Sequence, residues 1–200
     1  MERSPSRAVK KLYELHGLKF ISPRLKVDLH LLDKILSGRI NISKDKFYDG
    51  CDRWLVIFEA ILAPLSKKQI EGILIKFNLK KEHRISILQS LRFSDMMNSL
   101  LKKNMRPSEV YSLLKPLCRE TILFIRLAAT NAKVCRRIDH FTKRAASVSL
   151  HINGEDLKSL GLEDGKKIGK ILREVLMSKL DGTVRTRSQE LHLARELARR

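Results

Sequence analysis

The lysines and arginines of residues 131–147 have the types and the spacing of a surface that binds a polyanion. When this segment is drawn as a helix at about 100° per residue, its six basic side chains fall within an arc of roughly 120°. Only Asp139 interrupts them, at the edge of the arc, whereas an ordinary solvated face mixes charges of both signs. An adjacent apolar arc would hold the helix in a core. The basic arc consists of Lys133, Arg136, Arg137, His140, Lys143 and Arg144, and the apolar arc of Val134, Ile138, Phe141 and Ala145.

A second basic face is predicted on the helix expected over residues 165–180. Lys166, Lys170 and Arg173 cluster within about 60° of one another, opposite a buried side formed by Ile168, Leu172, Val175 and Leu176. The turn Gly161–Gly165 comes before this helix, and a glycine there lets a phosphate approach the backbone N–H groups closely. Such a phosphate would also meet Lys166 or Lys167, although Glu163 and Asp164 in the same turn weigh against it. Arg185 and Arg187 add a further basic corner.

The composition points to the same class of partner. The 200 residues include 41 Lys and Arg against 22 Asp and Glu, a formal net charge of +19, while 43% of residues are hydrophobic. This charge favours a polyanion, nucleic acid first, and the apolar content favours a packed core over disorder. Contacts made to phosphates depend on shape and charge rather than base identity, which suits a folded RNA.

Base stacking is not expected to contribute to binding. Aromatic residues are 6% of the chain, and six of them lie at helical spacing among aliphatic residues. They are therefore expected in the core, and single-strand binding by stacking is not supported. The six are Trp54, Phe58, Phe77, Phe93, Phe124 and Phe141.

Catalytic and metal-binding patterns are absent from the sequence. There is no GxxxxGK[ST] loop, no GxGxxG turn, no HExxH and no His/Cys spacing that closes a metal site. The pairs Glu155–Asp156 and Glu163–Asp164 are adjacent residues, which point in different directions on a helix and suit the positive end of its dipole. Three scattered cysteines argue against a disulfide framework, and no apolar run is long enough to cross a bilayer. We expect a cytoplasmic protein with no catalytic residue, metal site or membrane contact in this chain.

Helical spacing runs through nearly the whole sequence, so the expected fold is all-α, a multi-helix body with a smaller helical tail. The period breaks near residues 147–152, which predicts a body over 1–147 and a tail over 148–200. Helices are expected at 6–16, 25–37, 50–63, 66–77, 80–103, 107–116, 119–129, 131–147, 154–160, 165–180 and 187–199.

Several helix ends have recognisable chemistry. Ser66 with Gln69, and Thr186 with Gln189, match the capping box, and Asn153 with Asp156 has the same geometry with shorter side chains. Pro107 suits a first helical position. Helices are expected to stop at Gly38, Gly161 and Gly182.

The tail resembles the C-terminal part of bacterial class II tRNA nucleotidyltransferases, the CCA-adding, A-adding and poly(A) polymerase enzymes. The family pattern is a Gly-x-Asp-Leu helix start, a Leu-Gly-Leu turn, Gly-x-x-Ile-Gly before an aliphatic helix, and a Leu-Asp-Gly turn before a final helix. The matching residues here are Gly154-Glu155-Asp156-Leu157, Leu160-Gly161-Leu162, Gly165 to Gly169, and Leu180-Asp181-Gly182 followed by Thr186 and Glu190-Leu191. Upstream, residues 106–114 and Ile21-Ser22-Pro23-Arg24-Leu25 are similar to other parts of the long bacterial members.

This resemblance implies a helical body and tail that hold the acceptor and T arms of tRNA. In the family a separate head binds Mg²⁺ and CTP or ATP and performs nucleotidyl transfer. The Gly-Ser and Asp-x-Asp residues of that head are not found here, so we expect this chain alone to be inactive and to work with a catalytic head domain or chain. It is then a truncated or split product, or an RNA-binding module retained alone.

Two other functions remain open at this point. The Leu-Gly-x-x-x-Gly turn also looks like a DNA-binding helix-hairpin-helix, although Gly161 and Gly165 are further apart than that motif prefers. The basic faces could instead contact an acidic protein in a non-catalytic scaffold.

Overall fold

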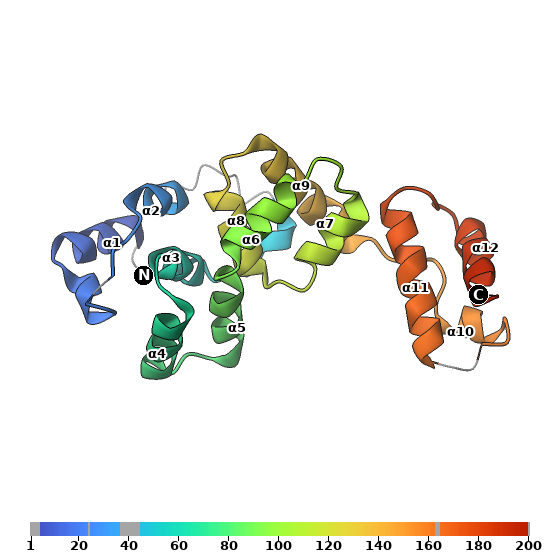
Figure 1. The fold of residues 1–200 in the computed structure, drawn as a ribbon, viewed down its shortest axis with the longest axis horizontal. Helices are drawn as coiled ribbons and strands as arrows, with labels where there is room; N and C mark the ends of the chain where they lie inside the picture. The colour runs from blue at the N-terminus through green and yellow to red at the C-terminus, as the bar shows by residue number, and fades with distance from the viewer. Residues whose placement is uncertain (1–4, 24, 37–44, 163–164, 200) are drawn as a thin grey trace. The chain divides into compact units, whose positions relative to one another are not determined.

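The computed structural model describes residues 5–23, 25–36, 45–162 and 165–199, and the predicted all-α fold is confirmed over these ranges (Figure 1). Gly38, Arg24, Glu163 and Asp164, and the predictions made for them, lie outside the described residues. The described helices are α1 (Pro5–Glu14), α2 (Leu29–Leu36), α3 (Arg53–Leu62), α4 (Lys67–Phe77), α5 (Lys81–Ser90), α6 (Phe93–Leu101), α7 (Pro107–Leu114), α8 (Arg119–Ala128), α9 (Ala132–Lys143), α10 (Gly154–Lys158), α11 (Gly165–Leu180) and α12 (Arg187–Ala198).

The single helix predicted over 80–103 was wrong, because the structure breaks it into α5 and α6. At the break the Ser90 hydroxyl donates to the Ile87 carbonyl at 2.8 Å, and the Arg92 N–H donates to the Gln89 carbonyl at 3.1 Å. Such local bonds replace the regular i to i−4 pattern and turn the chain. The helix predicted over 131–147 also ends early, since Arg144 leaves helical geometry (φ −134°, ψ −62°) and a 3₁₀ turn, Ala145–Ser147, follows.

The predicted helix ends are largely confirmed. Capping boxes form at Ser66–Gln69, Asn153–Asp156 and Thr186–Gln189, so orphan N–H groups at three helix starts have acceptors. Pro107 is the first residue of α7. Gly161 and Gly182 both have positive φ, as a helix stop requires.

The chain divides into two compact units, which are described separately. The first unit contains residues 1–103 and 116–139, and the second contains 104–115 and 140–200. The division falls within α9, between Asp139 and His140. The division predicted at residues 147 and 148 stays a prediction.

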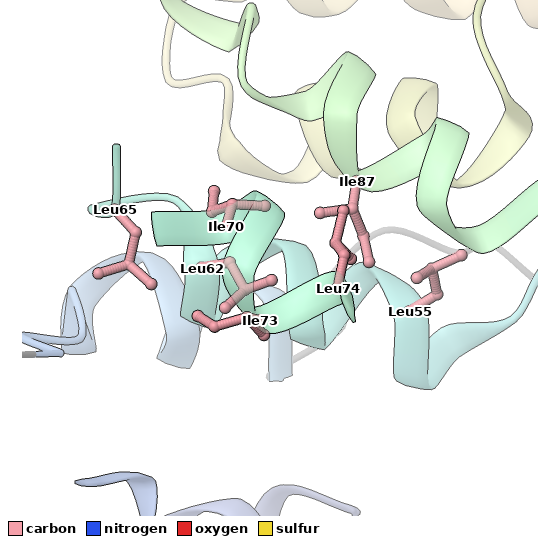
Figure 2. Packing of buried hydrophobic residues seen from close by; sticks show 7 residues of the cluster. All are labelled: Leu55, Leu62, Leu65, Ile70, Ile73, Leu74 and Ile87. Atoms are coloured by element: carbon pink, nitrogen blue, oxygen red, sulfur yellow. The ribbon is translucent and has the colours of Figure 1, made fainter. Parts of the chain in front are cut away.

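In the first unit, α3, α4 and α5 enclose an aliphatic core (Figure 2). Figure 2 shows Ile87 of α5 lying against Leu74 of α4, with side chains of α3 beside them. Helix α8 packs on α2, α3 and α5 and is buried along most of its length. The aliphatic cluster consists of Leu55, Leu62, Leu65, Ile70, Ile73, Leu74 and Ile87.

Basic side chains satisfy carbonyl groups at helix C-termini within this unit. The ammonium of Lys34 on α2 donates to the carbonyls of Ala128 and Ala129 at 2.9 and 2.6 Å, where α8 ends. The last four carbonyls of a helix have no partner within it and carry the negative end of its dipole. A lysine from another helix therefore stabilises this end and fixes the two helices to each other.

In the second unit, α10, α11 and α12 share an apolar core, and α7 joins them through Asp181. The Asp181 carboxylate accepts from the Ser108 N–H at 2.8 Å and from the Ser108 hydroxyl at 2.7 Å. Asp181 lies in the turn after α11, so the Leu-Asp-Gly turn caps the N-terminus of α7, 73 residues away in sequence. The core consists of Ile152, Leu157, Ile168, Ile171, Val175, Val184 and Ala194.

Glu190 fixes the segment before α10 in this unit. Its carboxylate is fully buried and binds Lys179 Nζ at 2.6 Å and the N–H groups of His151 and Ile152 at 2.7 and 3.2 Å. These bonds lower the pKa of Glu190, although burial alone would raise it. The Glu-Leu pair of the final helix therefore has a structural role.

Glu59 is the buried acid in the core of the first unit. Its Oε1 accepts from the Ser86 hydroxyl at 2.6 Å, and Ser86 Oγ lies 3.1 Å from Thr121 Oγ1. The buried Oε2 has no hydrogen-bond partner among the described residues. Burial raises the pKa of Glu59 to about 8, and the bond from Ser86 only partly opposes this shift.

Glu59→Gln is expected to flatten the pH dependence of stability. Between the ordinary pKa near 4.5 and the folded pKa of about 8, the folded state keeps a proton that the unfolded state releases. The free energy of unfolding therefore falls as pH rises through this window, by at most about 1.4 kcal/mol for each pH unit from this group. The variant lacks this titration, so its stability relative to wild type should rise from pH 5 to pH 8. Urea unfolding followed by circular dichroism measures this, and parallel curves would contradict it.

Candidate nucleic-acid interface

Helix α9 has the apolar face that its sequence predicts. Val134, Ile138 and Phe141 of α9 are buried, as is Ala145 in the 3₁₀ turn after it, with at most 2% of each exposed. The other side chains of the helix are thereby oriented away from the core. The basic side chains named from the sequence nevertheless differ in what they contact, and the two parts of α9 belong to different units.

On the part of α9 in the first unit, two of the three basic residues cap another helix. Lys133 Nζ lies 3.1 Å from the Lys103 carbonyl and 3.5 Å from that of Leu101. The Arg137 guanidinium donates to the carbonyls of Leu100 and Lys102, the latter at 2.8 Å. Both side chains thus bind the C-terminal end of α6, where cations are favoured.

Arg136 differs from these two neighbours because its side chain is exposed to solvent. Asp139, the acid at the edge of the predicted face, accepts two bonds from Arg126, at 2.6 and 2.9 Å. The paired geometry raises the pKa of Arg126 and neutralises the Asp139 charge. The carboxylate therefore subtracts little from the positive potential around Arg136.

The second unit places most of its predicted binding residues at the surface. On α11, Lys166, Lys170 and Arg173 follow one another at helical spacing and are all exposed. The opposite side of this helix is buried through Ile168, Ile171 and Val175. Ile171 was absent from the predicted buried set, and Leu172 and Leu176, which were in it, are only half-buried. Lys143, Arg144 and Arg185 are also exposed.

Lys167 and Arg187 of this unit have structural partners. Lys167 Nζ donates to the Ala198 carbonyl at 3.0 Å, near the end of α12. Arg187 forms an ion pair with Asp156, a residue that also accepts the Asn153 N–H in its capping box. The phosphate site predicted at Gly165 with Lys166 or Lys167 stays a prediction, because the residues just before Gly165 are not described.

The predicted burial of the aromatic residues was wrong at two positions. Phe124 and Phe141 are in the core, but Trp54 and Phe77 are each 43% exposed. Helix α3 is apolar around almost its whole circumference, so spacing alone does not distinguish its buried from its exposed side. Phe58 and Phe93 lie between these extremes, half-buried.

No group of three or more His, Cys, Asp or Glu side chains that could hold a metal occurs in the described part of the chain. Within the same residues, no helix has the length and apolar character needed to cross a bilayer. Glu155 forms an ion pair with Lys158, so both acids of the Glu155–Asp156 pair have partners.

Comparison with known proteins supports the resemblance to tRNA nucleotidyltransferases that the tail motifs indicate. The chain is similar in sequence to the A-adding tRNA nucleotidyltransferase of Geobacter sulfurreducens, with 26% identity over 208 aligned positions. This alignment covers 98% of the chain and 23% of that relative. No protein-family model matches the chain.

The fold is similar to that of solved CCA-adding enzymes. The Thermotoga maritima CCA-adding enzyme complexed with tRNA matches with a TM-score of 0.71 and 20% identity over 96% of this chain and 47% of that one. A CCA-adding enzyme complexed with CTP matches with a TM-score of 0.73 and 22% identity over 96% and 46%. The chain thus spans about a quarter of the curated relative and less than half of each solved chain.

Arg137→Ala is expected to lower the free energy of unfolding by about 1–3 kcal/mol, because it leaves two carbonyls at the end of α6 without their charged donor. Arg136→Ala, at the preceding position, removes the same charge from an exposed site and should change the free energy of unfolding by less than about 0.5 kcal/mol. Urea unfolding of both variants tests this assignment. Equal effects would contradict the structural role given to Arg137.

Proposed function

We propose that this chain binds tRNA through its phosphates, as the helical body and tail of a tRNA nucleotidyltransferase-type protein. The observation that carries the proposal is the similarity of nearly the whole chain to an A-adding tRNA nucleotidyltransferase. A solved relative of the same fold is a complex with tRNA, which supports tRNA as the partner. The net charge of +19 favours binding to the phosphates of an RNA.

The exposed cations of the second unit are the proposed phosphate contacts. A lysine or arginine that already binds a carbonyl or carboxylate must give up that bond to reach a phosphate, whereas a solvated one gives up only water. We therefore assign the main contacts to exposed side chains that are given no partner inside the protein by the bonds described above. They are Lys143, Arg144, Lys170, Arg173 and Arg185, with Arg136 as the corresponding residue of the first unit. Lys166 is exposed but has a partner within the protein, so it is proposed as an additional contact only.

The predicted residues with internal partners have a secondary role in this proposal. Lys133, Arg137, Lys167 and Arg187 would add to the positive potential near the RNA without leaving their partners. The contacts are proposed to hold the acceptor and T arms for CCA or A addition. Mg²⁺ and CTP or ATP would bind a head domain that is not in this chain, and the site of action would be the cytoplasm.

Lys170→Ala with Arg173→Ala is expected to weaken tRNA binding and its salt dependence together. Each phosphate contact contributes about 0.9 to the slope of log K against log salt on a duplex. Loss of two contacts should therefore reduce the magnitude of the slope by about two. Fluorescence anisotropy of a labelled tRNA transcript, measured from about 50 to about 300 mM salt, gives the affinity and the slope of log K against log salt.

The matched control is Lys67→Ala with Lys68→Ala, which removes the same charge from exposed positions at the start of α4. An equal loss in both double variants would mean that net charge, and not the α11 face, determines binding. Equal affinity for duplex DNA would favour the helix-hairpin-helix function, and equal competition by polyglutamate would favour the scaffold. No binding at low salt would exclude the proposal.

A further inference from the structure

An exposed aromatic cluster in the first unit has no role in the phosphate contacts proposed above. Trp54 lies in the first turn of α3 and is 43% exposed. Its ring centroid is 4.9 Å from that of His83, at an interplanar angle of 85°, and 6.4 Å from that of Phe58, at 42°. Neither neighbour lies parallel to the indole, so neither is stacked face to face on it.

The indole is held by rings from more than one helix. Phe58 contacts Phe77 of α4 at 6.0 Å between centroids, and His83 belongs to α5. The His83 ring is itself fixed, because its Nε2 lies 3.1 Å from Asp52 Oδ2. The Asp52 N–H donates to Glu120 Oε1 of α8 at 3.2 Å. An exposed ring fixed in this way loses little conformational entropy when a ligand covers it.

Exposed cationic residues predominate in the sequence next to this cluster. Arg53 is adjacent to Trp54 in sequence, and Lys80 is the N-cap residue of α5, three positions before His83. Lys81 and Arg84 are exposed on the same helix. The acids next to the cluster are Asp52, which is bound to His83, Glu120, which accepts from the Asp52 N–H, and Glu82.

We propose that Trp54 is a stacking platform for an unpaired base of the bound RNA, with Arg53, Lys80 and Arg84 on the flanking phosphates. This inference rests on the proposed function and adds a contact to base rings in the first unit. Single-stranded nucleic acid is bound by aromatic faces set among cations. The fully buried centre of a protein interface is instead depleted of lysine, so the lysines around Trp54 favour RNA over an apolar protein partner.

Trp54 is the only tryptophan of the chain, so its emission reports on this site directly. The chain is titrated with a tRNA transcript and with a uridine oligonucleotide, while anisotropy of the labelled RNA measures binding in parallel. Stacking quenches indole emission with the same midpoint as the anisotropy change. Trp54→Ala should weaken binding roughly 5- to 150-fold, the range for one stacked base. Trp54→Phe keeps an aromatic face and should lose much less.

Phe20→Ala is the control, because Phe20 is an aromatic residue of the same unit that is 83% exposed and lies outside this cluster. Circular dichroism and urea unfolding establish that each variant is folded, and quenching of the wild-type Trp54 emission still tests the inference if Trp54→Ala does not fold. If tRNA binds but the emission of Trp54 and the affinity of its variants stay unchanged, the inference is wrong and the proposed function stands. If tRNA does not bind, both are wrong. An emission shift that follows protein concentration without RNA would assign the surface to a second copy of the chain.

Discussion

The fold depends on supplying donors to the ends of short helices. Twelve described helices, none longer than 16 residues, leave many terminal carbonyls without partners. Basic side chains from other segments fill this need at three described helix ends, α6, α8 and α12. A helix start needs the opposite, an acceptor for its N–H groups, and Asp181 supplies it on α7. The high lysine and arginine content therefore has a structural use before any partner is considered.

This requirement divides the cations into two groups. Side chains such as Arg137 and Lys34 bind carbonyls and hold helices together, while Arg136 and Lys170 extend into solvent. A count of charges, or a helical projection, treats both groups alike. Binding of a polyanion is proposed for the second group because no internal bond has to break. The proposed stacking by Trp54 would add a contact that is less sensitive to salt.

Sequence analysis succeeds here where short-range chemistry decides the structure. The three capping boxes and the apolar face of α9 follow from spacings of three and four residues, and they are confirmed. The contacts of Arg137 with residues 35 and 37 positions away cannot be found in this way, because they depend on packing between separated helices. The same holds for the exposure of Trp54 and for the break at Ser90, where a side-chain bond overrides helical spacing. The motifs of the tail identified the similarity to tRNA nucleotidyltransferases that the comparisons support.

The most direct test of this account is lysine-reactive labelling with mass spectrometry, with and without saturating tRNA. Lys143 and Lys170 should react readily in the unbound protein and become protected when tRNA binds. Lys133 should react slowly in both states, since its ammonium already donates to carbonyls at the end of α6. Unchanged labelling of these two exposed lysines at saturation would contradict the claim that their side chains hold the RNA.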